Sequence, residues 1–160
     1  TGVLRSAYML GNGEEVMLAA TDLLAETKVA PELSNEAHYY RAKAYLDAGK
    51  VEGAMDDLKI LAKDTRNIYG AEAKYKVAQI YFDAGQTEQA EKEVLDYIEV
   101  STPHTYWLAR SFVLLSDVYM KLGRNLDAKQ YLLSLKQNYQ ADDDIAGMIE
   151  SRLNKLNAEN

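Results

Sequence analysis

One short run of acidic residues has the composition of a calcium-binding loop. The run 142–144 consists of three aspartates, and Gly147 stands at the sixth position counted from the first of them. The fifth position is Ala146 and the twelfth is Leu153, so two of the ligands that such a loop needs are missing. We therefore interpret the aspartates as a helix start, where carboxylates face the positive end of the helix dipole.

A second run, Gly11, Asn12 and Gly13, has the paired glycines of a phosphate-binding loop. Val16 occupies the place of the third glycine, and no strand is predicted before the run. We expect a turn between two helices here.

Residues that could support acid–base or metal chemistry are few. His38 and His104 each lie at or near a predicted helix start, and neither has a second His close by in sequence. The chain has no cysteine, which excludes thiolate metal sites and cysteine nucleophiles. The spacing of Asp and Glu is typical of solvated helix faces. The sequence thus predicts no enzyme, no metal and no cofactor. A carboxylate-based glycan-processing enzyme is a remote alternative, which would require two acidic side chains to meet in a closed pocket.

Composition limits the partners of the chain. Its 160 residues are 48% hydrophobic and 27% charged, as expected for one domain or one continuous array. The net charge of -7 argues against binding to nucleic acid, and the absence of a long apolar run argues against membrane insertion. Because the chain begins at Thr1, we interpret it as a fragment or processed form.

One pattern occurs three times along the chain. A tyrosine precedes a glycine by four residues and an alanine by nine, in Tyr45–Gly49–Ala54, Tyr81–Gly85–Ala90 and Tyr119–Gly123–Ala128. Apolar residues recur every three or four positions on both sides of each glycine, which predicts two amphipathic helices per copy. The glycine ends the first helix because it accepts a left-handed backbone conformation. A weaker fourth copy contains Tyr8 and Ala20.

Small residues in this pattern predict close helix packing. Ala42, Ala78 and Ser116 lie three residues before the three tyrosines, which are themselves predicted to be core residues. A large side chain in place of the repeated alanines 54, 90 and 128 should cost about 1–3 kcal/mol by overpacking.

This order of small residue, aromatic residue, glycine and alanine resembles the tetratricopeptide repeat (TPR). The resemblance implies an all-α, right-handed α-α superhelix of three to four helical hairpins. We expect a single array over residues 1–160, with a degenerate repeat at 1–34, repeats at 35–68, 69–104 and 105–141, and a capping helix at 142–157. The outer face of that helix is predicted to carry Ser151, Arg152, Asn154 and Lys155.

The repeat period exceeds the family norm. The alanines at positions 20, 54, 90 and 128 are spaced by 34, 36 and 38 residues. This is similar to the longer repeats of bacterial cell-envelope proteins, so we expect part of a larger bacterial protein with further repeats upstream. Among compartments, the periplasm or cell envelope is favoured over the cytoplasm.

The resemblance also implies where a partner binds, because such arrays present a concave groove lined by first helices. The corresponding positions here are Tyr39, Lys43, Tyr75, Lys76, Gln79, Phe82, Asp117 and Met120. We expect the aromatic residues to anchor a partner peptide or helix, unless they only cover neighbouring helices, and the lysines to supply charge. The family's clamp for C-terminal carboxylates is not reproduced. The predicted function is a non-catalytic protein–protein interaction scaffold, with a structural spacer or oligomerisation module as the alternative.

Overall fold

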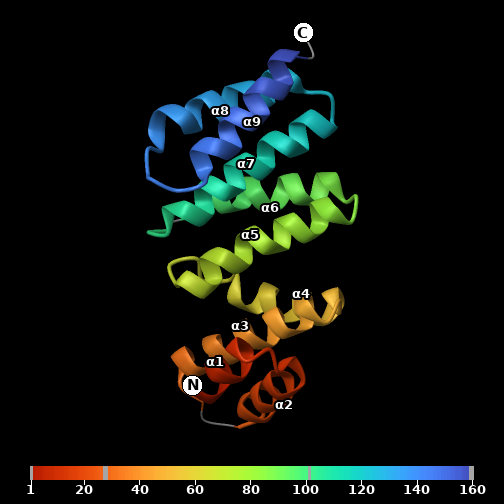
Figure 1. The fold of residues 1–160 in the computed structure, drawn as a ribbon, viewed down its shortest axis with the longest axis vertical. Coiled ribbons are helices and arrows are strands. Elements are labelled where there is room, and N and C mark those ends of the chain that lie inside the picture. Colours follow the sequence, from red (N-terminus) through yellow and green to blue (C-terminus); the bar gives the residue numbers. More distant parts are fainter. Residues whose placement is uncertain (1, 27–28, 101, 159–160) are drawn as a thin grey trace. The chain divides into compact units, whose positions relative to one another are not determined.

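The computed structural model describes residues 2–26, 29–100 and 102–158. All regular secondary structure in these residues is α-helical, in nine helices (Figure 1). The chain divides into two compact units, Thr1–Val77 and Ala78–Asn160. The predicted all-α class is confirmed, whereas the handedness of a superhelix stays a prediction.

The first unit contains α1 (Gly2–Met9), α2 (Gly13–Leu24), α3 (Pro31–Asp47), α4 (Val51–Leu61) and the start of α5 (Ile68–Asp83). Helix α3 is central, because it packs against α1, α2 and α4. It begins at Pro31, where the fixed φ of proline suits the first turn of a helix.

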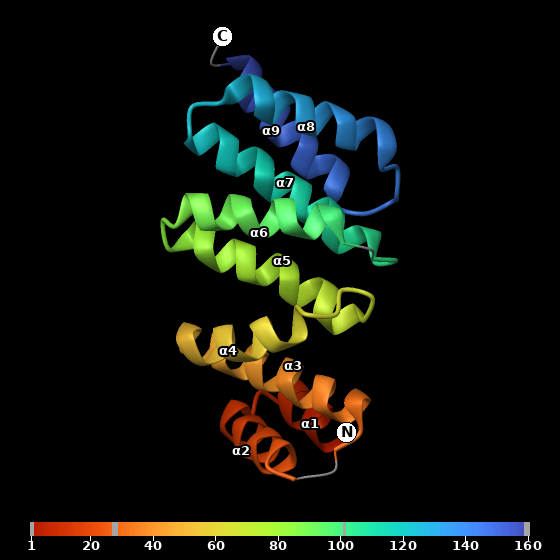
Figure 2. The ribbon, with the colours of Figure 1, turned by 180° about the vertical axis from the view of Figure 1, so that it is seen from behind.

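The second unit contains the end of α5, then α6 (Thr87–Glu99), α7 (Thr105–Lys121), α8 (Asn125–Asn138) and α9 (Ile145–Ala158). Helix α7 packs against α6, α8 and α9, and α8 also contacts α9 (Figure 2). The last helix buries Ile145, Ile149, Leu153 and Leu156. This is the covering role predicted for the final helix.

The glycines of the repeat end the first helices of the hairpins as predicted. Gly49, Gly85 and Gly123 have φ values of 75°, 79° and 77°. In each case the residue after the glycine donates its N–H to the carbonyl of the repeat tyrosine at 2.8 Å. This is the hydrogen bond of a Schellman cap, so the four-residue spacing from tyrosine to glycine follows from helix termination.

The two polar runs start or connect helices, as expected. Asn12 is the N-cap of α2: its side chain accepts a hydrogen bond from the Glu15 N–H at 3.2 Å and donates one to the Glu15 carboxylate at 2.7 Å. Asp143 accepts a hydrogen bond from the Ile145 N–H at 2.9 Å at the start of α9. Both arrangements satisfy backbone donors that a helix start leaves free.

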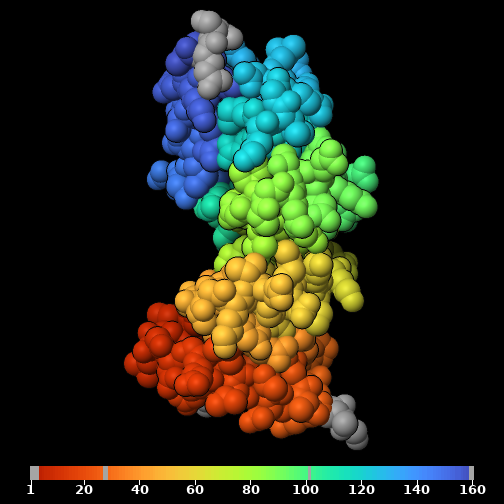
Figure 3. All heavy atoms as spheres, turned by 90° about the vertical axis from the view of Figure 1, so that its right-hand side faces the viewer, coloured from red at the N-terminus to blue at the C-terminus, as the bar shows by residue number. Residues whose placement is uncertain are grey.

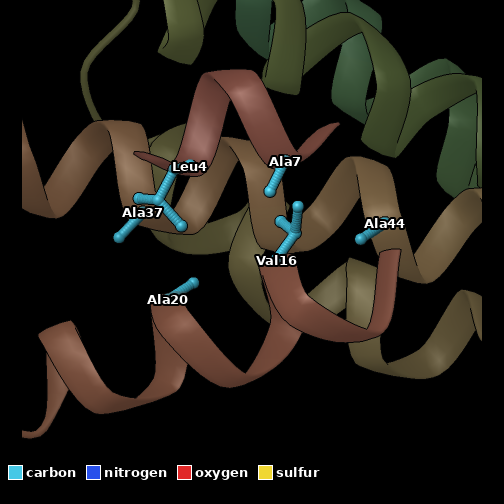
Figure 4. Close-up of a cluster of buried hydrophobic side chains, with 6 residues drawn as sticks. All are labelled: Leu4, Ala7, Val16, Ala20, Ala37 and Ala44. Carbon is cyan, nitrogen blue, oxygen red and sulfur yellow. The ribbon is translucent and has the colours of Figure 1, made fainter. Parts of the chain in front are cut away.

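Small side chains allow the close helix packing. In the first unit, Figure 4 shows Leu4, Ala7, Val16, Ala20, Ala37 and Ala44 pointing toward one another from α1, α2 and α3. The repeated alanines 54, 90 and 128 are fully buried, as the overpacking argument requires. Of the repeat tyrosines, Tyr119 is buried, but Tyr45 and Tyr81 are only partly buried. The ring of Tyr45 lies over Gly53, where an added Cβ would come within 3.2 Å of the ring atoms.

Gly70 lies in close contact with the backbone at the end of α4. A Cβ added there would lie 2.6 Å from the Leu61 carbonyl oxygen and still nearer to that of Asp64. The first turn of α5 therefore meets the end of α4 at a distance that only glycine permits.

We predict that Gly70→Ala lowers the free energy of unfolding by about 1–3 kcal/mol or more, because the backbone at Leu61 and Asp64 must move to admit the methyl group. The matched control is Gly147→Ala in α9, where an added Cβ meets nothing within 4 Å. This control should gain about 0.5–1 kcal/mol from the better helix propensity of alanine. Urea unfolding of both variants checks the prediction, and equal effects in the two would refute it.

Candidate binding face of the first unit

Helices α1, α3 and α5 together form one face of the first unit. Contacts between α1 and α3, and a hydrogen bond from α3 to α5, place these helices side by side. We call this surface the first-helix face and define it by Tyr8, Tyr39, Tyr40, Lys43, Tyr69, Glu72 and Lys76. Its polar contacts and its ring contacts both centre on Tyr39.

Glu72 connects the charged and hydroxyl groups of this face. It is only 8% exposed, and its two carboxylate oxygens accept from the Tyr39 hydroxyl at 3.1 and 3.2 Å. Lys76 Nζ lies 2.8 Å and Lys43 Nζ 3.6 Å from the same oxygen, Oε2. Burying a carboxylate costs free energy unless it is paired and hydrogen-bonded. The Tyr39 hydroxyl and the two lysine ammonium groups offset this cost, and they hold the Glu72 side chain in place.

Four tyrosine rings lie in series across the face. The ring centroids of Tyr8 and Tyr40 are 5.6 Å apart, those of Tyr40 and Tyr39 are 5.2 Å apart, and those of Tyr39 and Tyr69 are 4.5 Å apart. All four side chains are partly buried. Such ring contacts favour a fixed arrangement, which leaves an ordered aromatic surface with part of each ring uncovered.

The electrostatics of the face keep Tyr39 neutral. Burial raises the pKa of the Tyr39 hydroxyl, and the charge of Glu72 and its hydrogen bond raise it further. Burial also raises the pKa of Tyr8, with Lys43 opposing and Asp47 adding to the rise. Tyr39 thus remains a hydrogen-bond donor, and two ammonium groups share the single Glu72 carboxylate.

The sequence-predicted groove residues of the first unit are only partly brought together. Tyr39, Lys43 and Lys76 meet around Glu72. Tyr75, the predicted counterpart of Tyr39 as an anchor, is 6% exposed and belongs to the core, which agrees with the alternative that it covers neighbouring helices. A core tyrosine cannot offer its ring to a partner without unpacking.

The other predicted groove residues lie in the second unit. Gln79 donates to the Asp83 carboxylate at 2.8 Å along the same helix, and Phe82 and Met120 are partly buried. Asp117 pairs with Arg152 through two hydrogen bonds of 2.7 and 2.9 Å. The prediction that Arg152 lies on the outer face of the last helix was therefore wrong. A bidentate guanidinium–carboxylate pair holds its side chain against α7 instead.

Sequence reasoning did not single out Glu72, Tyr69 or Tyr8 for the binding face. A signal for Glu72 was available: it lies 36 residues after Glu36, as Tyr75 does after Tyr39, and the repeat pattern places Glu36 on the groove-lining side of a first helix. Its partner Tyr39 is 33 residues away, and only the packing of α3 beside α5 brings the two together.

A second polar cluster lies between the helices of the first unit. Asp57 of α4 is 1% exposed, and Arg41 donates to its two oxygens at 2.8 and 2.6 Å. His38 Nδ1 donates to the same carboxylate at 2.7 Å, and Arg41 also donates to Thr21 at 3.1 Å. These bonds connect α2, α3 and α4, and they give His38 a structural role.

The carboxyl group of Asp57 has opposing influences on its pKa. Burial raises the pKa, but the hydrogen bonds from Arg41 and His38 together lower it below its ordinary value of 3.8. Asp57 therefore stays ionised in the folded unit, as a pair of this kind requires.

Three open hollows contain one carboxylate each, from Glu52, Glu88 and Glu150. The described part of the chain holds no cluster of three His, Cys, Asp or Glu residues suited to a metal ion. None of its helices has both the length and the apolar character needed to cross a bilayer.

Comparisons with known proteins returned no matching family model, no similar curated protein and no similar solved structure.

We predict that Asp57→Asn lowers the free energy of unfolding by about 3–5 kcal/mol at pH 7, because it leaves the Arg41 charge without its partner. The folded-state pKa of Asp57 is depressed, so its contribution is present above the ordinary value of 3.8 and is lost as the pH falls through the folded-state value. The stability gap between wild type and variant should thus narrow in acid.

Urea unfolding at neutral and acidic pH measures this gap. Asp56→Asn is the matched control, since Asp56 is the exposed neighbour of Asp57 and its loss should change stability by no more than about 0.5 kcal/mol. A gap that is the same at both pH values, or equal effects of the two substitutions, would contradict the role assigned to Asp57.

Proposed function

We propose that this chain is a non-catalytic, TPR-like interaction module that binds a segment of a partner protein on the first-helix face. Within this proposal it forms part of a larger bacterial protein, at the cell envelope. The observation that carries the proposal is the series of four tyrosine rings, in which Tyr39 also donates a hydrogen bond to the shared Glu72 carboxylate.

The chemistry of this face suits recognition of a protein segment. Tyrosine buries much area on binding and loses little side-chain entropy, which is why it is enriched at energetically important interface positions. Here the ring contacts and the Tyr39–Glu72 hydrogen bond already restrict the side chains before a partner arrives. Less conformational entropy is therefore lost on binding.

The face also offers charge of both signs. Lys43 and Lys76 are 25% and 26% exposed, so their ammonium groups can reach a bound segment while they contact Glu72. Opposite charges close together give orientation and specificity to a contact whose affinity comes from the rings. A mixed aromatic and charged surface of this kind fits a peptide or a partner helix.

Selection of short random peptides against the chain, followed by affinity measurement, tests this function. We expect the double variant Tyr69→Ala, Lys76→Met to weaken the selected peptides at least about tenfold, or roughly 1.4 kcal/mol. The matched control, Leu126→Ala with Lys92→Met, removes an exposed apolar group and one charge from the second unit and should leave affinity unchanged.

Circular dichroism must show that both double variants are folded. Peptides that bind the Tyr69/Lys76 variant as tightly as wild type, or a selection that yields no binding peptide, would refute the proposed binding face.

Self-association is a second candidate function, favoured by exposed apolar side chains on the α1–α2 hairpin. Leu10 is 84% exposed and Leu18 is 65% exposed. Figure 3 shows the red and orange atoms of this hairpin at the surface of the first unit. Exposed apolar groups of this size are common at contacts between proteins, and they fit the spacer or oligomerisation alternative.

Under this second candidate, sedimentation velocity should show larger species as the protein concentration rises. The variant Leu10→Ser, Leu18→Ser should remain monomeric, whereas Leu126→Ser, equally polar but in the second unit, should associate like wild type. A wild-type chain that stays monomeric at all concentrations would exclude the candidate.

A further inference from the structure

The ammonium group of Lys43 occupies an aromatic site within the first-helix face. Its Nζ lies 4.9 Å from the centroid of the Tyr39 ring and 5.8 Å from that of the Tyr8 ring. The carboxylate of Glu72 is 3.6 Å away. Two aromatic rings and one carboxylate around a cation form the arrangement by which proteins bind alkylammonium groups.

Lys43 is held less firmly than the other lysine of the face. Its distance to Glu72 Oε2 is 3.6 Å, against 2.8 Å for Lys76, although the two side chains are about equally exposed. If Lys43 moved away, Glu72 would keep the Lys76 ion pair and the Tyr39 hydrogen bond. Because lysine has a flexible four-carbon stem, its ammonium group can exchange between this site and water at small cost.

We propose that Tyr8, Tyr39 and Glu72 form a binding site for an alkylammonium cation, which Lys43 occupies in the free protein. The ligand is the ammonium group of a basic side chain in the bound partner segment, which replaces Lys43 over the Tyr39 ring. The charge of the chain agrees with a basic partner, since its net charge is -7 and it attracts cations over distance.

This site deepens the proposed function and rests on it for the identity of the ligand as part of a protein. Lys43 competes with the ligand, so the apparent affinity for a cation is reduced by the fraction of molecules in which Lys43 fills the site. Removing the Lys43 side chain should therefore increase the affinity for a cation. If Lys43 instead only contacted the partner, its removal would decrease the affinity for that partner.

Titration with tetramethylammonium, observed through the tyrosine ring resonances by NMR, tests the site without a partner. We expect Lys43→Ala to bind this cation at least about tenfold more tightly than wild type, and Lys43→Ala with Glu72→Gln to lose that gain. Lys43→Met should bind more weakly than Lys43→Ala, because its side chain still fills the space. Lys43→Ser replaces Lys43→Ala if the alanine variant does not fold.

Lys92→Ala in α6 is the control for general charge, since it changes the net charge by the same amount in the second unit. It should bind tetramethylammonium like wild type. Equal affinity of Lys43→Ala and wild type, or a gain that survives Glu72→Gln, would overturn the cation site. If peptide binding still depends on Tyr69 and Lys76 in that case, only the cation site is refuted and the proposed binding face is retained.

Discussion

The arrangement of the first-helix face depends on one nearly buried carboxylate. Glu72 is removed from water by the packing of α5 beside α3, and it must therefore find donors within the protein. Tyr39 and the two lysines supply them, which fixes the hydroxyl, the ammonium groups and the ring of Tyr39 relative to one another. The aromatic series extends from that ring, so the proposed recognition chemistry of the face follows from the position of a single acid.

That position in turn depends on small residues in the backbone packing of the first unit. Gly70 lets the first turn of α5 approach the end of α4, and Glu72 follows it by two residues. Ala37 and Ala44 are buried on α3 and let α1 and α2 lie close to it. The Asp57–Arg41 pair joins α4 to α3. Close packing thus brings α1, α3 and α5 near enough for their tyrosines to meet.

The sequence could predict the features that depend on local spacing. Capping chemistry predicts the helix ends at Gly49 and Gly85 and the start of α9. Periodicity predicts the buried alanines such as Ala54. The site was harder to predict because its pairs join distant residues. Tyr39 and Tyr75 occupy the same repeat position, yet one contacts Glu72 and the other is buried in the core. Periodicity gives a residue's place on its helix, whereas neighbouring helices decide what it touches.

A double-mutant cycle between Tyr39→Phe and Glu72→Gln tests most directly whether the Glu72 carboxylate organises this face. Tyr39→Phe removes the donor hydroxyl, and Glu72→Gln removes the charge of the acceptor; both keep the shape of the side chain. We predict a coupling free energy of about 1–2 kcal/mol from urea unfolding, as expected for a hydrogen bond to a charged group in a partly buried site. Additive effects of the two substitutions, with a coupling energy near zero, would contradict the account.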